Sequence, residues 1–324
     1  MAGTLSVAGE GPLVYEGKDG PGKGKHIVFL AGDEEYRSEE CIPMLARILA
    51  VRHGFKCTVL FTTNPADGTI DPCNLSNIPG IEALDNADMA FMFLRFRDFG
   101  DKMKHIVDFV NSGKPILGIR TSTHAFNIKD AKSPYAKYSF NNGAWPGGFG
   151  QQVLGETWVN HHGNHGKESQ RGIINPAMKD HPILRGVEDI WAPTDVYTVT
   201  HLPPDAKVLV HGQVLEGMKP EDKPLEGPKN NPMMPIIWLH EYKGEAGKTT
   251  QAICSTIGSG VDFQSEGLRR VMVNACYWAL GLADKIPAKS DVSYVGDYKP
   301  TWFGFGKFTK GIKPADLALP ADAE

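Results

Sequence analysis

Three imidazoles lie within five residues in the stretch NHHGNHG, residues 160–166. The whole chain has 11 histidines, so random placement would rarely gather His161, His162 and His165 this closely. Imidazole titrates near neutral pH, which suits proton transfer in catalysis. We therefore predict catalytic roles for His161 and His165 and a substrate-binding role for His162.

A metal site is the second interpretation of the same stretch. His161 and His165 are four residues apart, so on a helix they could share an ion, but the intervening glycines favour a loop. An HExxH pattern would indicate a zinc hydrolase, but the chain has none. A divalent metal held by these two histidines is thus an alternative that we do not favour, and a plain surface loop is a third.

Two tryptophans precede the histidine stretch, at positions 145 and 158. Aromatic faces are common platforms for sugar rings, and on this basis we predict that Trp158 binds substrate. Packing in the hydrophobic core explains each tryptophan equally well.

Acidic side chains are concentrated in GDEEYRSEE, residues 32–40, directly after an apolar run. In a turn at the end of a strand, Glu35 could act as a base and Arg37 could pair with it or with a substrate. The alternative is a helix start, where the macrodipole stabilises acidic residues in the first turn. The two interpretations carry equal weight for Glu35 and Arg37, whereas Glu39 and Glu40 are predicted to be solvated.

Two arginines alternate with a phenylalanine in RFRD, residues 95–98. In an extended chain Arg95 and Arg97 point to the same face. Their guanidinium groups could clamp a hydroxyl-rich or anionic substrate. An Arg–Asp pair that only holds the loop together is an equally good explanation.

A turn of unusual composition, GIRTSTHAFN, residues 118–127, follows the apolar run PILGI. His124 is predicted to be catalytic, with a histidine packed beneath the neighbouring loop as the alternative. The stretch lacks the Gly-x-Ser-x-Gly pattern of a serine nucleophile, so Ser122 is predicted to cap the following helix.

Apolar runs that alternate with amphipathic segments provide the elements to position these groups. The pattern predicts buried strands at 26–32, 56–61, 88–96 and 115–119, and helices at 41–54, 101–114 and 266–282. The first helix is placed near Cys41 because the ring of Pro43 would clash with an earlier start. Alternating strands and helices indicate a parallel sheet covered on both faces, whose ligands bind beyond the carboxyl ends of the strands. The acidic bend, RFRD and the His124 turn should therefore line one rim.

The rest of the chain divides by composition. Residues 1–25 form a Gly- and Lys-rich arm, 26–285 form the α/β domain, and 286–324 form an irregular tail that packs through its aromatic residues. Within the domain, residues 130–170 are predicted to be an ordered insertion over the rim. Strand patterns at 194–202, 206–215, 235–243 and 249–258 indicate a mixed sheet or an antiparallel extension.

Composition excludes several classes of function. The net charge is −4 and no basic block is interleaved with aromatics, so nucleic-acid binding is not expected. No segment approaches the roughly 18 apolar residues needed to span a membrane. The five cysteines form no CxxC pair, which argues against a disulfide framework or zinc finger. The first 25 residues do not resemble a signal peptide, and the sequence leaves both the compartment and a homo-oligomer open.

The order of these segments resembles the ThuA-like (trehalose-utilisation) family, which is similar in structure to class I glutamine amidotransferases. The resemblance covers roughly residues 24–285. It rests on HIVFLAGDEEYRSEE, GKPILGIRTSTHAF, NHHGNHG, PIIWLHEY and STIGSGVDFQSEGLRRVMVNACYWALG. It implies a flavodoxin-like, mostly parallel sheet with helices on both faces and a link to sugar metabolism. Related chains also suggest export, with a leader removed.

The resemblance sharpens the interpretation of the turn at residues 118–122. Class I amidotransferases carry a pattern like Gly-Ile-Cys-x-Gly there, with the cysteine as nucleophile. This chain has Arg120 at the cysteine position, and a guanidinium has no nucleophilic form at accessible pH. Glutaminase activity is therefore not expected.

These observations together predict a carbohydrate-active enzyme that needs no cofactor. It would act on a keto-sugar or keto-glycoside by general acid/base proton transfer, giving isomerisation or elimination. Glu35 or a histidine of the loop would be the base, His124 would protonate the opposing oxygen, and Arg120 or Arg95 would stabilise enediolate charge. A metal-dependent hydrolase and a non-catalytic sugar-binding protein are the alternatives.

Overall fold

A ten-stranded mixed sheet organises the chain, of which the computed structural model describes residues 11–319. The strands are β1 (Leu13–Tyr15), β2 (His26–Gly32), β3 (Lys56–Phe61), β4 (Met89–Leu94), β5 (Ile116–Ile119), β6 (Gln170–Ile174), β7 (Ile190–Ala192), β8 (Lys207–Val214), β9 (Met234–Lys243) and β10 (Thr249–Ser255). Their order across the sheet is β1-β3-β2-β4-β5-β10-β9-β8-β6-β7.

The parallel half of the sheet carries the rim. β3, β2, β4, β5 and β10 run parallel to one another, while β1 at one edge and β9, β8, β6 and β7 at the other pair antiparallel. The predicted α/β class is confirmed. The predicted flavodoxin-like, mostly parallel sheet is confirmed only in part, because half of the strands are antiparallel.

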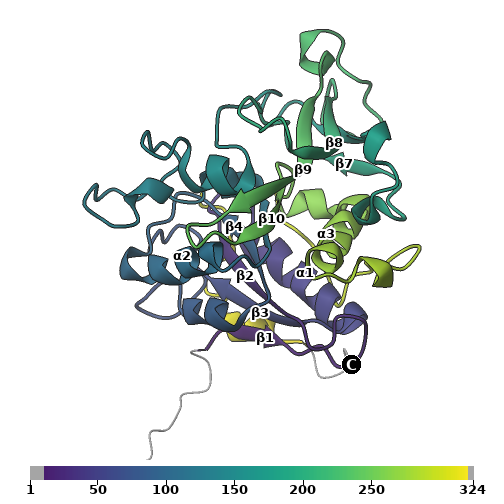
Figure 1. The fold of residues 1–324 in the computed structure, drawn as a ribbon. Coiled ribbons are helices and arrows are strands. Elements are labelled where there is room, and N and C mark those ends of the chain that lie inside the picture. The colour runs from purple at the N-terminus through teal and green to yellow at the C-terminus, as the bar shows by residue number, and fades with distance from the viewer. Residues whose placement is uncertain (1–10, 320–324) are drawn as a thin grey trace, which may run out of the picture.

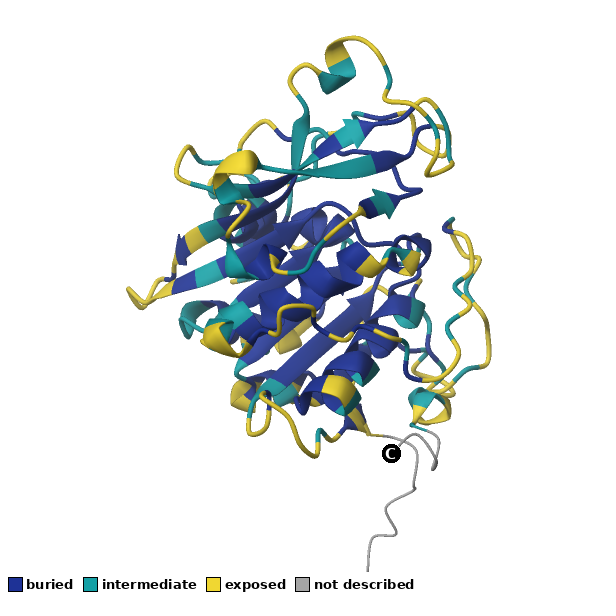
Figure 2. Ribbon diagram, turned by 90° about the vertical axis from the view of Figure 1, so that its right-hand side faces the viewer, coloured by how far each residue is buried: buried dark blue, intermediate teal, exposed yellow. Residues whose placement is uncertain are grey.

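Helices cover both faces of the parallel strands (Figure 1). α1 (Ser38–His53) and α3 (Glu266–Ala279) share a core with the side chains of Ile27 and Phe29, whereas α2 (Met103–Asn111) shares one with Val28 and Leu30. Successive residues of β2 thus point to opposite helical layers, as the period of a strand requires. Burial concentrates in these layers, and the loops of the antiparallel extension are exposed (Figure 2).

Short helical turns fill the connections. They are η1 (Ile81–Asn86), η2 (Gly100–Lys102), η3 (Arg120–His124), η4 (Ala136–Tyr138), the π-helical η5 (Gly150–Leu154), η6 (Pro176–Met178), η7 (Pro182–Leu184), η8 (Pro228–Asn230), η9 (Val261–Gln264), η10 (Ala283–Lys285) and η11 (Pro314–Leu317). Within residues 11–319, no helix is both long and apolar enough to cross a membrane.

The start of α1 differs from the prediction. The helix begins at Ser38, not near Cys41, and Pro43 lies inside it. The carbonyl of Arg37 accepts hydrogen bonds from the amides of Glu40 and Cys41, so helical bonding is established before the proline is reached.

The turn after β5 also differs, because it forms only the 3-10 turn η3 and no α-helix follows. The carbonyls of His124 and Ala125 accept hydrogen bonds from the amides of Phe96 and Arg97, which diverts the chain from helical pairing. Ser122 does not cap a helix, since its hydroxyl donates to the Met92 carbonyl at 2.8 Å.

A strand predicted at 194–202 is reduced to one isolated bridge. Tyr197 pairs there with His161, and the amide of His162 donates to the Val196 carbonyl at 2.9 Å. This short pairing brings the histidine stretch beside residues 195–197.

Candidate active site

Strained backbone marks the rim where β2, β4 and β5 end. Arg37, Phe96 and Arg120 have φ values of 64°, 54° and 46°, and they are the described non-glycine residues with positive φ. Non-glycine residues rarely adopt this backbone conformation, which costs about 1–3 kcal/mol per residue. Residues with such strain are concentrated at functional sites. The three segments that the sequence predicts at one rim are also the three that carry this strain.

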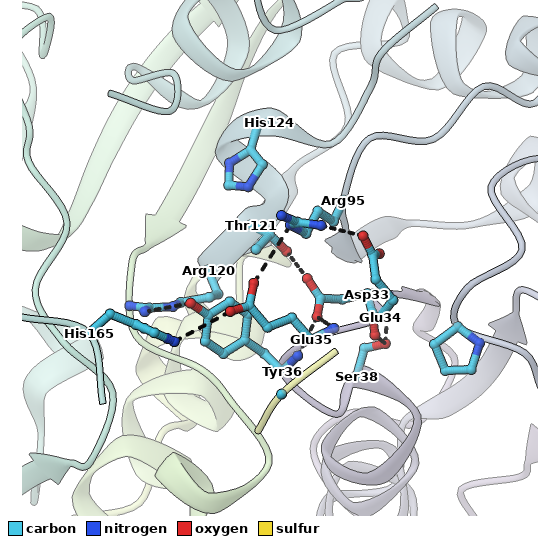
Figure 3. Close-up of polar contacts among 12 residues, drawn as sticks. Asp33, Glu34, Glu35, Tyr36, Ser38, Arg95, Arg120, Thr121, His124 and His165 are labelled. Carbon is cyan, nitrogen blue, oxygen red and sulfur yellow. Dashed lines mark hydrogen bonds and ion pairs between the residues drawn. The ribbon is translucent and has the colours of Figure 1, made fainter. Parts of the chain in front are cut away.

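Asp33 ties the acidic bend to the β5 turn. One of its carboxylate oxygens accepts from the amides of Glu35 and Tyr36, at 2.8 and 2.5 Å, and the other accepts from the Thr121 hydroxyl at 2.6 Å. Figure 3 shows the bond from Thr121 joining the acidic bend to the turn after β5. The bend is thereby fixed in position before any ligand binds.

The two arginines of RFRD have different environments. Arg97 is fully buried, donates to the carbonyls of Gly32 and Asn74, at 2.6 and 2.7 Å, and pairs with Glu34 at 2.7 Å. Arg95 also contacts Glu34, but its Nε lies 3.9 Å from Glu35 Oε2 and has no hydrogen-bond partner among the described residues. All the donors of Arg97 are thus directed at the scaffold, whereas the buried Nε–H of Arg95 is unpaired among the described residues.

Arg120 and Asp195 form a buried ion pair beneath the rim. Arg120 Nη2 lies 2.9 Å from Asp195 Oδ1, and Nη1 donates to the carbonyls of Asp195 and Thr256 at 2.7 and 2.8 Å. The guanidinium lies 3.8 Å from the ring centroid of Tyr197 and 4.5 Å from that of Tyr36. Burial alone would raise the pKa of Asp195, but Arg120 and two histidine hydrogen bonds hold that pKa well below its ordinary value.

Asp195 supports two histidines of the NHHGNHG stretch. Its Oδ2 lies 2.6 Å from His161 Nδ1 and its Oδ1 lies 3.0 Å from His165 Nδ1. About a third of each imidazole side chain is exposed, 36% and 34% respectively. On its other side, His165 Nε2 lies 3.5 Å from Glu35 Oε1, which connects the histidines to the acidic bend (Figure 3).

These three residues could also provide metal ligands. One donor atom each from His161, His165 and Asp195 lies within 4.8 Å of the others. The donor types suit zinc or another divalent ion. However, both Asp195 oxygens already accept hydrogen bonds, from Arg120 and from the two imidazoles, so an ion would compete with these contacts for the carboxylate.

His124 is buried on the opposite side of the same space. Its Nδ1 lies 3.1 Å from Thr123 Oγ1, and its ring packs against those of Phe96 and Trp158, with centroids 4.9 and 5.2 Å apart. Burial, and then the positive charges of Arg95 and Arg120, lower its pKa well below the ordinary value. His124 is therefore a neutral imidazole at physiological pH.

A cavity of about 210 Å³ lies between these groups. Its lining comprises Glu35, Tyr36, Arg95, Phe96, His124, Trp158, His161, His165, Tyr197 and Phe305. Six of the residues predicted from the sequence are in that lining, and they come from four separate segments of the chain.

Four other predicted residues lie outside the lining. Arg37 donates to the carbonyls of Trp302 and Gly304 in the tail. His162 Nε2 lies 2.8 Å from the Lys229 carbonyl oxygen. Arg97 and Arg120 are buried behind the lining in the contacts described above.

Sequence reasoning missed Asp195, which orients both histidines, and the aromatic lining residues other than Trp158, namely Tyr36, Phe96, Tyr197 and Phe305. Asp195 is one of 38 acidic residues and has no motif around it. The signal that could have found it is the β-rich stretch TDVYTVT, which pairs with the histidine stretch through Tyr197.

Comparisons with known proteins identify the fold. No protein-family model and no curated protein matches the chain. The structure is similar to that of a ThuA-like protein from Parabacteroides merdae, with a TM-score of 0.52 and 10% identity over 80% of this chain and 91% of that chain. A ThuA-like protein from Bacteroides uniformis matches with a TM-score of 0.45 and 14% identity, over 81% of this chain and 93% of that one. The predicted ThuA-like fold is confirmed.

Proposed function

We propose that this chain, with its ThuA-like fold, is an enzyme that acts on a keto-sugar or keto-glycoside by general acid/base proton transfer. The observation that carries the proposal is the cavity itself, where an aspartate-supported imidazole, a carboxyl group, a neutral imidazole and a guanidinium face one another. The carbohydrate class comes from the family resemblance. Arg120 at the nucleophile position argues against glutaminase chemistry.

His161 is the proposed base. Its Nδ1–H donates to the ionised Asp195, which leaves the lone pair of Nε2 free to accept a proton. The carboxylate fixes the tautomer and stabilises the imidazolium that forms. The proton removed is the one on the carbon next to the substrate carbonyl.

Arg95 and His124 are the proposed donors to the oxygen that gains negative charge. The Nε–H of Arg95 has no partner within the described chain, and His124 is neutral, so it donates a hydrogen bond from Nε2 in the appropriate tautomer. Donors that are placed before the reaction stabilise an enediolate without reorganisation.

Glu35 and His165 are the proposed route for the second proton transfer. Burial, followed by the charge of Asp33, raises the pKa of Glu35, so the carboxyl carries a proton at higher pH than usual. In elimination, the electron pair of the broken C–H bond forms a double bond and expels the glycosidic oxygen, which takes the Glu35 proton. In isomerisation, that proton goes to the former carbonyl carbon, while the hydroxyl of the enediolate becomes the new carbonyl and passes its proton to the former carbonyl oxygen.

The proposal predicts turnover of oxidised glycosides. A panel of 3-keto-glycosides incubated with the protein in deuterated water should give products by mass spectrometry: for isomerisation, an isomer with deuterium at the former carbonyl carbon, and for elimination, the free aglycone with an unsaturated keto-sugar that has lost the proton next to the carbonyl. The variant His161→Gln should lower kcat by about 10²–10⁴-fold, while His162→Gln, outside the cavity, should leave kcat near the wild-type value. Binding without turnover of any member would instead indicate a non-catalytic sugar-binding protein.

A metal-dependent hydrolase is the second candidate, and the three convergent donors favour it. After addition of zinc or manganese and extensive dialysis, elemental analysis would detect a retained ion. Stoichiometric metal that is lost in His161→Ala would replace the proton-transfer mechanism by metal-assisted hydrolysis.

A further inference from the structure

A segment of the C-terminal tail, Trp302–Gly306, crosses the acidic bend beside the cavity. The amides of Gly304 and Gly306 donate to the carbonyls of Glu35 and Glu34, at 2.7 and 3.3 Å. The buried ring of Phe303 packs against Tyr36 and His165, with centroids 5.7 and 5.3 Å apart. We call this segment, residues 302–306, the strap.

Phe305 is the exposed aromatic of the strap that reaches the cavity. Phe305 is 60% exposed, yet it belongs to the cavity lining. The guanidinium of Arg95 lies over the ring, 4.9 Å from its centroid, and also 4.6 Å from the centroid of Phe96. Phe305 is therefore held in place through Arg95 while much of its ring remains open to solvent.

The size of the cavity limits what it encloses. A volume of about 210 Å³ is below the roughly 300–1,000 Å³ of pockets that enclose drug-sized ligands, and it suits a single sugar ring. The rest of any larger substrate must extend out of the cavity, past the exposed ring of Phe305.

We propose that Phe305 forms an outer subsite, which stacks against the second ring of a glycoside whose keto-sugar ring lies in the cavity. The proposal rests on the proposed function and specifies its substrate class as a disaccharide or an aryl glycoside. Pyranose rings present apolar C–H faces, and burying an exposed aromatic ring against such a face is favourable.

The test compares ligands that contain one ring and two rings. Calorimetric titration would measure Kd for methyl glucoside and for a glucose disaccharide, with neither ligand oxidised, so that binding is observed without turnover. The wild-type protein should bind the disaccharide about five- to tenfold more tightly. Phe305→Ala should bring this ratio close to one, and Phe305→Tyr should retain it.

Trp302 provides the matched control. It lies in the same strap and is 51% exposed, but it is not part of the cavity lining, so Trp302→Ala should keep the wild-type ratio. Thermal unfolding of each variant would verify that the strap substitutions leave the fold intact.

The outcomes separate the subsite from the reaction. A wild-type ratio near one, an unchanged ratio in Phe305→Ala, or no binding of either ligand would overturn the subsite. A ratio that depends on Phe305 without turnover of the oxidised forms would retain the subsite and remove the proposed function. If wild type and Phe305→Ala both turned over oxidised methyl glucoside and oxidised disaccharide, with the same KM for each substrate in the two proteins, the proposed function would stand and the subsite would be overturned.

Discussion

Glu39 is a buried carboxyl group that the fold leaves without a hydrogen bond among the described residues. Its side chain is 9% exposed, neither carboxyl oxygen has a hydrogen-bond partner, and Oε1 forms an ion pair with Arg37 Nη1 at 3.6 Å. Burial raises its pKa to about 8. The sequence prediction of a solvated Glu39 is wrong, because α1 begins at Ser38 and the tail crosses it there, with Thr301 bonded to Glu40.

This environment predicts a pH-dependent stability. The pKa of Glu39 is about 8 in the folded protein, against an ordinary value of 4.5, so the folded state binds the proton more tightly. The free energy of unfolding should therefore fall as pH rises from about 5 to 8. Glu39→Gln removes this effect and should gain more than about 1.4 kcal/mol relative to wild type between pH 5 and 8.5, the equivalent of one pKa unit.

Urea denaturation at the two pH values measures this difference. The control is Glu188→Gln, whose side chain is 74% exposed and whose stability should follow the wild type. Parallel pH profiles for wild type and Glu39→Gln would show that the carboxyl is hydrated after all.

The residues that follow the strands were the most informative signal for the site in the sequence. Glu35, Arg95 and His124 follow three parallel strands, and the rule that such ends meet at one edge places them together. Asp195 escaped prediction because it enters the site through a pairing between residues more than 30 positions apart, which leaves no local pattern.

Among the elements, the π-helical turn η5 fixes the insertion onto the rim. A Cβ at Gly150 would lie 1.9 Å from the Thr123 carbonyl oxygen, so the two backbones are in direct contact beside His124. The carbonyl of Leu154 accepts from Trp238 Nε1 at 2.7 Å, which attaches the other end of the turn to β9. The insertion thus packs against His124 through Phe140 and Trp158.

Gly150→Ala should therefore destabilise the protein by about 1–3 kcal/mol, since the added methyl group forces η5 away from the β5 turn. Gly143→Ala is the matched control, because a Cβ there meets no atom within 4 Å. Chemical denaturation measures both variants. Equal stability would mean that the insertion shifts freely over the rim and does not hold His124 in place.

The sequence predicts an ordered insertion at residues 130–170, but it does not predict the π-helical turn within it. A five-residue π-helical turn has no sequence pattern distinct from that of a loop. The missing helix after β5 has a similar cause, because the backbone bonds that replace it come from residues 96 and 97, on another strand end.

For the whole molecule, the tail connects distant parts of the chain through hydrogen bonds. The carbonyl of Leu317 accepts from Tyr15 and Arg47, and that of Ile312 accepts from the amide of Ile70. Nearer its start, the Val292 carbonyl accepts from Arg269 in α3. Composition predicts an irregular tail but not its path, because bonds from side chains to distant carbonyls have no local signature.

Arg37 connects the tail to the acidic bend at the candidate site. Its guanidinium donates to the carbonyls of Trp302 and Gly304, so one fork holds the strap against the acidic bend. Lysine has the same charge but a single nitrogen, which cannot occupy both positions. Arg37→Lys should therefore loosen the strap without removing positive charge from the rim.

Hydrogen exchange would detect this loosening at the amides of Gly304 and Gly306, which donate to the acidic bend. Loss of one hydrogen bond from a charged group is worth about 1.5–3 kcal/mol, so exchange should become about ten- to a hundredfold faster at both amides. Arg52→Lys is the control, since Arg52 contacts Asp291 and Tyr294 outside the strap. If protection at both glycines stayed at the wild-type level in Arg37→Lys, the aromatic packing of Phe303 alone would have to anchor the strap.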